Sequence, residues 1–154
     1  MKSIRQSIYF VTIALILSCI YSCHPTYYYK ITDISDPTHP CFSISRSRVF
    51  PWAPGMGNIV SIDEVDSKGK LIKRVWAIDR FDCNKNRIKK LCYGTVPSGY
   101  KELSKSIPIE MNKYYSIYSS PGATWSYFKI SRREDDINVE VYKASEFFKK
   151  IVNN

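Results

Sequence analysis

The fold is decided by residues 58–80, which read NIVSIDEVD (58–66), SKG (67–69) and KLIKRVWAIDR (70–80). We expect strands over residues 58–66 and 70–80. Ser67-Lys68-Gly69 supplies a three-residue connection, with glycine where a positive φ is needed. The preceding residues 51–57 (PWAPGMG) form a loop, because they are rich in Pro and Gly. This stretch therefore predicts a β-hairpin that begins after a loop.

Further strands extend from this hairpin in both directions. Ile137, Val139 and Val141 alternate with more polar neighbours, which is the period of two expected of a strand with one buried face. A short helix is expected over residues 145–152, with Ser145 as its cap. Other strands are predicted at residues 27–32, 41–50, 91–94, 113–119 and 124–131, with exposed loops at 82–90 and 132–136.

Seven or eight short strands predict an all-β protein, a small antiparallel β-sandwich or barrel, and a β-sandwich of the immunoglobulin-like type is favoured. Trp76 and Trp125 are expected in its core. The chain has 154 residues, enough for one domain, and its twelve Tyr favour strands. With 44% hydrophobic and 24% charged residues, the composition excludes collagen-like, low-complexity and wholly disordered proteins.

The N-terminus resembles a bacterial lipoprotein signal. Lys2 and Arg5 precede an apolar run over residues 8–17, which is shorter than the roughly twenty residues of a membrane span. The sequences ILSC (16–19) and IYSC (20–23) both resemble a lipobox, in which a small residue precedes the cysteine that receives lipid. Cys23 is favoured because a polar, Pro-containing chain follows it, and Cys19 is the alternative. An ordinary cleaved signal and an uncleaved anchor are the other interpretations.

With Cys23 lipidated, residues 1–22 are a removed signal peptide, residues 23–40 a lipidated tether, and residues 41–154 a single β-sandwich domain. Neither cysteine is followed by Asp, so the resemblance implies a lipid anchor in the outer membrane of a Gram-negative bacterium, facing the periplasm. Cleavage lowers the formal charge of +9 to 9 − 2 = +7. Nucleic acid is not an expected partner, because the periplasm holds no chromosomal DNA.

Five cysteines occur, at positions 19, 23, 41, 83 and 92. In an oxidising compartment we expect disulfides among them. Cys41 and Cys92 lie at the edges of predicted strands far apart in sequence, so we expect them to pair, with Cys83–Cys92 as the alternative. If Cys23 carries lipid and Cys19 leaves with the signal, one thiol is left over. A disulfide-linked dimer therefore stays open, and the oligomeric state is not predicted.

The sequence lacks the motifs of common enzymes. It contains two His and no G-x-S-x-G, H-E-x-x-H or P-loop pattern. Asp63 and Glu64 are adjacent on a predicted strand, so they point to opposite faces and do not form a carboxylate pair. We therefore expect a binding protein and not an enzyme, with no cofactor and no metal site.

Four short motifs follow one another along the chain: His24-Pro25 after the lipobox, CFSI at 41–44, CYG at 92–94 and KYYSI at 113–117. Together they resemble a family of small periplasmic lipoproteins regarded as immunity proteins of type VI secretion systems. The resemblance covers about residues 23–130. It implies a protein that binds a cognate antibacterial effector delivered by a sister cell and blocks it.

A β scaffold with aromatic and basic loops suits binding hot spots. The positive charge favours a partner with an acidic face, through faster encounter. It disfavours inhibition of common animal lysozymes, which are basic. The alternative function is an envelope-maintenance lipoprotein that binds peptidoglycan, lipopolysaccharide or an assembly complex. The predicted partner-contacting residues are Trp52, Met56, Lys85, Arg87, Lys89, Lys90 and Tyr100.

Overall fold

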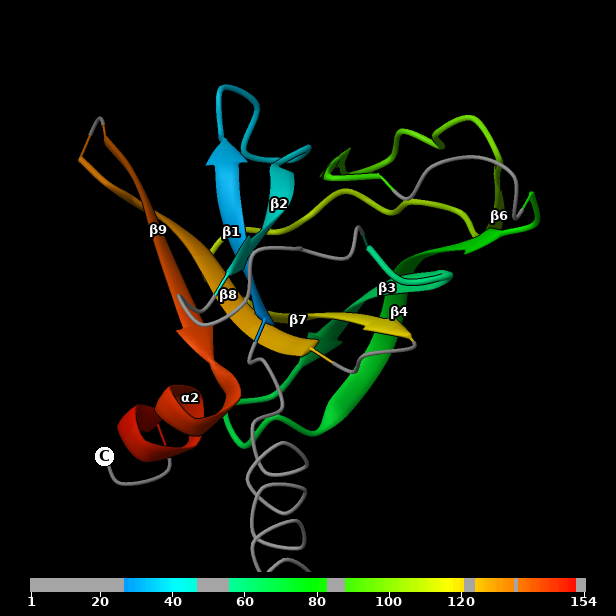
Figure 1. The fold of residues 1–154 in the computed structure, drawn as a ribbon. Helices are drawn as coiled ribbons and strands as arrows, with labels where there is room; N and C mark the ends of the chain where they lie inside the picture. The colour runs from blue at the N-terminus through cyan, green and yellow to red at the C-terminus, as the bar shows by residue number, and fades with distance from the viewer. Residues whose placement is uncertain (1–26, 47–55, 83–87, 121–123, 135, 152–154) are drawn as a thin grey trace, which may run out of the picture.

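The computed structural model describes residues 27–46, 56–82, 88–120, 124–134 and 136–151 (Figure 1). Within these residues lie nine strands and a short C-terminal helix. In chain order they are β1 (Tyr27–Asp33), β2 (Cys41–Arg46), β3 (Ile59–Val65), β4 (Leu71–Arg80), β5 (Lys90–Cys92), β6 (Tyr100–Ser104), β7 (Tyr114–Ser120), β8 (Thr124–Arg133), β9 (Asp136–Lys143) and α2 (Ala144–Ile151).

The strands form two antiparallel sheets. The small sheet has the order β1-β2-β5 and the large sheet the order β6-β4-β3-β7-β8-β9. The predicted all-β sandwich with a short C-terminal helix is confirmed. Its strands divide six and three, whereas an immunoglobulin constant domain divides them four and three. Consecutive hairpins, β3–β4 and β7–β8–β9, build most of the large sheet.

The predicted β3–β4 hairpin is confirmed, and Asp66 holds its turn. The carboxylate oxygen Oδ1 of Asp66 accepts hydrogen bonds from the amides of Lys68 and Lys70, each at 2.8 Å. Gly69 has a φ of 77°, in the left-handed region that favours glycine. The hairpin strands occupy the middle of the large sheet, since β3 pairs with β7 and β4 pairs with β6.

The core lies between the two sheets. The small sheet contributes Tyr29, Phe42 and Leu91, and the large sheet contributes Ile62 and Trp76, all of them buried. The core position predicted for Trp76 is confirmed. Burial of these large apolar side chains is the main stabilising contribution to a domain of this size.

Trp125 lies on the opposite face of the large sheet, and the prediction that it belongs to the core was wrong. Its side chain is 44% exposed and its ring lies 4.9 Å from that of Tyr118, measured between centroids. Successive strand residues point to opposite faces. Because the next residue, Ser126, is buried and accepts a bond from β1, Trp125 points outward.

β1 belongs to the sandwich and not to a tether, so the predicted domain boundary at residue 41 was wrong. The strand pairs with β2 along its length. Tyr29 is only 1% exposed, and its amide donates a hydrogen bond of 2.9 Å to Oγ of Ser126 on β8. These contacts place the start of the sandwich at Tyr27. Residues 23–26 of the predicted tether lie outside the described residues.

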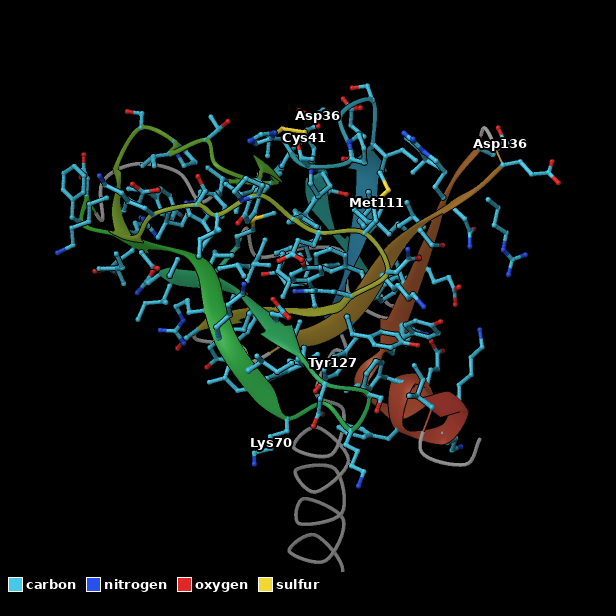
Figure 2. The ribbon with its side chains drawn as sticks, turned by 180° about the vertical axis from the view of Figure 1, so that it is seen from behind. Asp36, Cys41, Lys70, Met111, Tyr127 and Asp136 are labelled. Carbon is cyan, nitrogen blue, oxygen red and sulfur yellow. A yellow bond between two sulfur atoms is a disulfide. The ribbon has the colours of Figure 1, made fainter. Side chains whose placement is uncertain are left out.

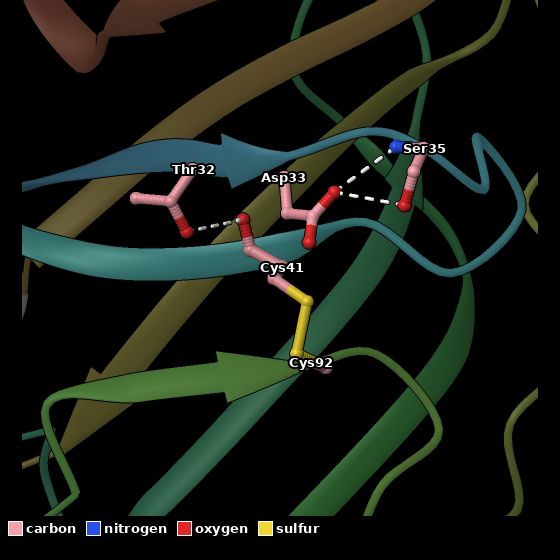
Figure 3. Close-up of a disulfide and its surroundings, with 5 residues drawn as sticks. All are labelled: Thr32, Asp33, Ser35, Cys41 and Cys92. Carbon is pink, nitrogen blue, oxygen red and sulfur yellow. Dashed lines mark hydrogen bonds between the residues drawn. A yellow bond between two sulfur atoms is a disulfide. The ribbon is translucent and has the colours of Figure 1, made fainter.

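A disulfide joins Cys41, at the start of β2, to Cys92, at the end of β5 (Figure 3). The two residues are directly opposite in the antiparallel register, although 51 positions separate them in sequence. The predicted Cys41–Cys92 pair is confirmed, and the alternative Cys83–Cys92 was wrong because Cys92 is already bonded. Cys83, Cys19 and Cys23 lie outside the described residues.

Two segments differ from the sequence prediction in secondary structure. Residues 132–136 were expected as a charged loop, but β8 extends to Arg133 and β9 begins at Asp136, with Glu134 at a φ of 54° in the turn. β6 was not predicted. Its sequence YKELS shows no alternation of apolar residues, because Tyr100 and Leu103 are three positions apart and therefore point to opposite faces of the strand. Tyr100 is buried, whereas Leu103 is exposed.

The helix α2 covers one end of the outer face of the large sheet (Figures 1 and 2). Phe147 is fully buried there, in a second apolar cluster with Val65, Tyr127 and Tyr142. The rings of Phe147 and Tyr127 stack with their centroids 4.1 Å apart. The predicted helix over residues 145–152 is confirmed, with both ends one residue earlier.

Two buried tyrosines predict how the fold responds to alkaline pH. Burial raises the pKa of Tyr29 to about 12, and it raises the pKa of Tyr93 to about 12. The Tyr93 hydroxyl also bonds the main chain of Val75 and Ile107. An unfolded tyrosine ionises near pH 10, so each neutral hydroxyl stabilises the fold fully below about pH 10. This stabilisation is lost as the pH rises from about 10 to about 12.

We therefore expect absorbance at 295 nm to show exposed tyrosines ionising near pH 10 while circular dichroism stays native. Tyr29 and Tyr93 should ionise only as the fold is lost at higher pH. The Tyr93→Phe variant should remove one tyrosine from that late step. Ionisation of all tyrosines in one step near pH 10, with native dichroism, would contradict the burial argument.

Candidate partner-binding surface

Met56 and Tyr100 lie in the core, so the prediction that they contact a partner was wrong. Met56 is fully buried, and its amide donates to the carbonyl of Ile88 at 2.8 Å. The Tyr100 hydroxyl donates to the carbonyl of Gly57 at 3.4 Å. A Cβ atom on Gly57 would lie 2.2 Å from the carbonyl oxygen of Ser120. The chain thus passes directly against the end of β7 and carries Met56 inward.

Lys89 and Lys90 are exposed, as a contact with a partner requires. Lys90 lies on the outer face of the small sheet, in register with Ser43 of β2, which is in turn in register with Lys30 of β1. The small sheet therefore carries cations on its outer face. The predicted contacts that lie outside the described residues are Trp52, Lys85 and Arg87.

The buried carboxylates Asp63 and Glu64 form ion pairs with neighbouring lysine and arginine side chains. The Glu64 carboxylate lies 3.2 Å from Nζ of Lys73 and 3.1 Å from Nζ of Lys113. Lys113 also lies 2.9 Å from Glu110, and this contact raises the pKa of Lys113 and lowers the pKa of Glu110. The adjacent Asp63 bonds instead to an arginine of β4 at 2.9 Å. We interpret the cluster as a structural ion-pair network.

A polar turn precedes β2. Nδ1 of His39 lies 2.8 Å from Oδ2 of Asp36, and hydrogen bonds from Thr38 and His39 lower the pKa of Asp36 to about 2. Both ends of this ion pair are about half exposed, so it caps a surface turn (Figure 2). Across the described ranges, no group of three or more His, Cys, Asp or Glu side chains is placed to hold a metal ion.

A groove runs between β1, at the edge of the small sheet, and β9, at the edge of the large sheet. It consists of two hollows, of about 260 Å³ and 420 Å³, that share Ile31 and Val141. The three strands of the small sheet cannot cover all six strands of the large sheet. On the inner face of β9, Ile137 and Val139 are therefore only partly buried, and Val141 is 38% exposed. We call this hollow, with Ile31, Val139 and Val141 as its apolar lining, the β1–β9 groove.

Main-chain groups of β1 point toward this groove. The N–H and C=O of one strand residue point to the same side, and those of the residue two positions on point there too. The Tyr29 amide points away from β2, because it donates to Ser126 on β8. Ile31 therefore presents its amide and carbonyl on that same side. Within the part of the chain that the structure describes, these two groups of Ile31 have no hydrogen-bond partner.

Two exposed cations lie on the strands around the groove, and one of them, Lys30, lines it. Lys30 is next to Ile31 on β1 and projects from the outer face of the small sheet. Arg132, on β8, is in register with Ile137 and thus lies on the inner face of the large sheet, outside the residues that line the two hollows. Neither cation has a carboxylate within 4.0 Å among the residues that the structure describes.

The two acids that line the groove already have partners. Asp33 accepts hydrogen bonds from the amide and the hydroxyl of Ser35, at 3.1 and 2.9 Å. Glu146 accepts a bond from the amide of Lys143 and lies 3.7 Å from its Nζ. Asp33 keeps its negative charge, because its Ser35 partners are neutral, so the lining carries two cations, Lys30 and Lys143, and two carboxylates. Of the two cations, Lys143 is paired with Glu146, and Lys30 is the one left for a ligand among the described lining residues.

No protein family, curated protein or solved structure matches the chain. Among the described elements, no helix is long and apolar enough to cross a membrane.

Sequence reasoning missed the β1–β9 groove. The alternation of Ile137, Val139 and Val141 correctly predicted a strand with one apolar face, but that face was assigned to a closed core. The signal that points to the groove is the pairing of the strands. Because β1, β2 and β5 form a separate sheet, these three strands alone face the six strands of the large sheet and leave part of it uncovered.

Proposed function

We propose that the protein is a periplasmic lipoprotein, anchored in the outer membrane through Cys23 or Cys19, that binds and neutralises a cognate antibacterial type VI secretion effector. The observation that carries this proposal is the open β1–β9 groove, with the exposed cation Lys30 beside it, on a sandwich whose small sheet is crosslinked by a disulfide. An unfilled apolar edge with main-chain groups directed into it is suited to binding another protein.

Two further features support the proposal. The Cys41–Cys92 disulfide fits an exported protein, because such bonds persist in oxidising compartments. The buried carboxylates Asp63 and Glu64 are held by their own cations, which favours a binding role over acid–base catalysis.

The test pairs the full chain with the product of the adjacent gene, directed to the periplasm of a toxin-sensitive strain. We expect the full chain to restore growth and to copurify with the toxin in a stoichiometric complex. The matched control is the chain without residues 1–22, which should remain in the cytoplasm and give no protection. Growth arrest that the full chain does not relieve, and the absence of a complex, would contradict the proposal.

The alternative is an envelope-maintenance lipoprotein, and the cations Lys30, Lys89 and Lys90 of the small-sheet region favour it. Retention of the full chain on lipopolysaccharide or peptidoglycan would support that function. The retention should be lost in roughly 0.5 M salt, because salt at this concentration screens surface charges. A growth defect of the deletion strain in pure culture would support it as well.

A further inference from the structure

We infer that the β1–β9 groove receives an extended segment of a partner protein, in which apolar and acidic side chains alternate, as an added strand beside β1. The inference rests on the proposed function for the identity of the partner. The chemistry of the segment is argued from the groove alone.

Main-chain pairing sets the place of the added strand. The Tyr29 amide is occupied by Ser126, whereas the amide and carbonyl of Ile31 are directed outward without a partner in the described chain. A segment beside β1 would satisfy these two groups as a sheet neighbour does. It would continue toward the end of the molecule where the turn bearing Asp36 and the hairpin bearing Asp136 lie, away from α2 (Figure 2).

The floor of the groove requires apolar side chains on one face of the segment. A strand beside β1 turns every second side chain toward the large sheet. There it meets Ile31, Val139 and Val141, which are partly buried and line the hollows. Covering them removes apolar surface from water, which favours binding.

The charges require acidic side chains on the other face. The outward-pointing residues of an added strand are the cross-strand neighbours of Lys30, and opposite charges in such pairs attract. A second copy of this chain fits poorly, because it would bring the same cations and, after cleavage, a formal charge of 9 − 2 = +7.

The test uses the full, acylated chain in detergent micelles and a fluorescent peptide of about eight residues that alternates valine and glutamate, a length typical of a strand. Fluorescence anisotropy should show saturable binding of this peptide and no saturable binding of a valine–lysine peptide of equal length. The Lys30→Glu variant should reverse this preference. The Val141→Asp variant should weaken binding of the valine–glutamate peptide at least about tenfold, because it removes apolar surface from the floor of the groove and adds a negative charge that would lose hydration when the peptide covers it.

Matched controls separate the groove from general effects of charge. Lys70→Glu makes the same charge change on the exposed β3–β4 turn, at a site remote from Asp36 and Asp136 (Figure 2). Leu103→Asp makes the same change from apolar to acidic on exposed β6. Both variants should bind the valine–glutamate peptide as the unmodified chain does. Circular dichroism checks that each variant is folded, and Lys30→Glu decides the question if Val141→Asp is not.

The inference would be overturned by no saturable binding of the valine–glutamate peptide, by binding unchanged by Lys30→Glu, or by a dimer in sedimentation that Val141→Asp converts to a monomer. The last result would assign the groove to a second copy. Neutralisation of the effector by Lys30→Glu and Val141→Asp variants that no longer bind the peptide would overturn the inference and leave the proposed function. Peptide binding by a chain that does not neutralise the effector would support the inference about the groove and contradict the proposed function.

Discussion

Replacing Cys41 and Cys92 together by alanine is expected to lower the free energy of unfolding by about 4 kcal/mol. The bond spans 51 positions of sequence, and a crosslink across a loop of this length removes much conformational freedom from the unfolded chain. β5 has only three residues, so few other contacts hold it against β2. Urea denaturation of the chain produced without residues 1–23, followed by circular dichroism, measures the loss.

Reduction of the disulfide provides the matched control. Unmodified protein in excess reducing agent should unfold at the urea concentration of the double variant, and the double variant should not respond to the reducing agent. Cys83→Ala should leave the unfolding midpoint unchanged. Equal midpoints for the oxidised protein and the double variant would show that the crosslink contributes nothing to stability.

Phe147→Ala is expected to lower the free energy of unfolding by about 3–5 kcal/mol, the cost typical of removing a fully buried phenylalanine ring. The ring is enclosed by Tyr114, Tyr127 and Tyr142 and is 0% exposed. It is the only residue of α2 that is buried in this way, so its loss also removes the contact that fixes the helix on the large sheet. The measurement is again urea denaturation, with helix docking followed by hydrogen exchange of the α2 amides.

Phe148 supplies the control on the same helix. Its side chain is 43% exposed and lies over the turn at Gly69. Phe148→Ala removes the same ring from the neighbouring position and should cost less than about 1 kcal/mol. Similar losses for Phe147→Ala and Phe148→Ala would contradict the burial pattern of the helix.

The hairpin, the disulfide and most strands were predictable because local signals determine them. Gly69 has the positive φ that its turn requires, and Cys41 and Cys92 stand at strand ends. Alternation over Ile137–Tyr142 marks β9 without any knowledge of its neighbours. In each case the residues that determine the structure are close in sequence, or they are cysteines, which have few possible partners in this chain.

The surface was less predictable because exposure depends on contacts between distant segments. Met56 follows a sequence rich in Pro and Gly, which predicted an exposed position, yet the close approach of Gly57 to Ser120 carries it into the core. Trp125 was expected inside on the basis of residue type, but its register with Tyr118 places it outside. The β1–β9 groove depends on which strands share a sheet, and that information is not contained in any one segment.

The separation between core and groove has an evolutionary consequence. Trp76 and Phe42 lie in the closed interior, where most substitutions lower stability. Val139, Lys30 and Arg132 are partly or largely exposed, so under the proposed function changes there would alter recognition at little cost to folding. A lineage can therefore acquire a new partner by drift along one open edge while the scaffold stays constant. Relatives of this chain should vary most at the edge between β1 and β9.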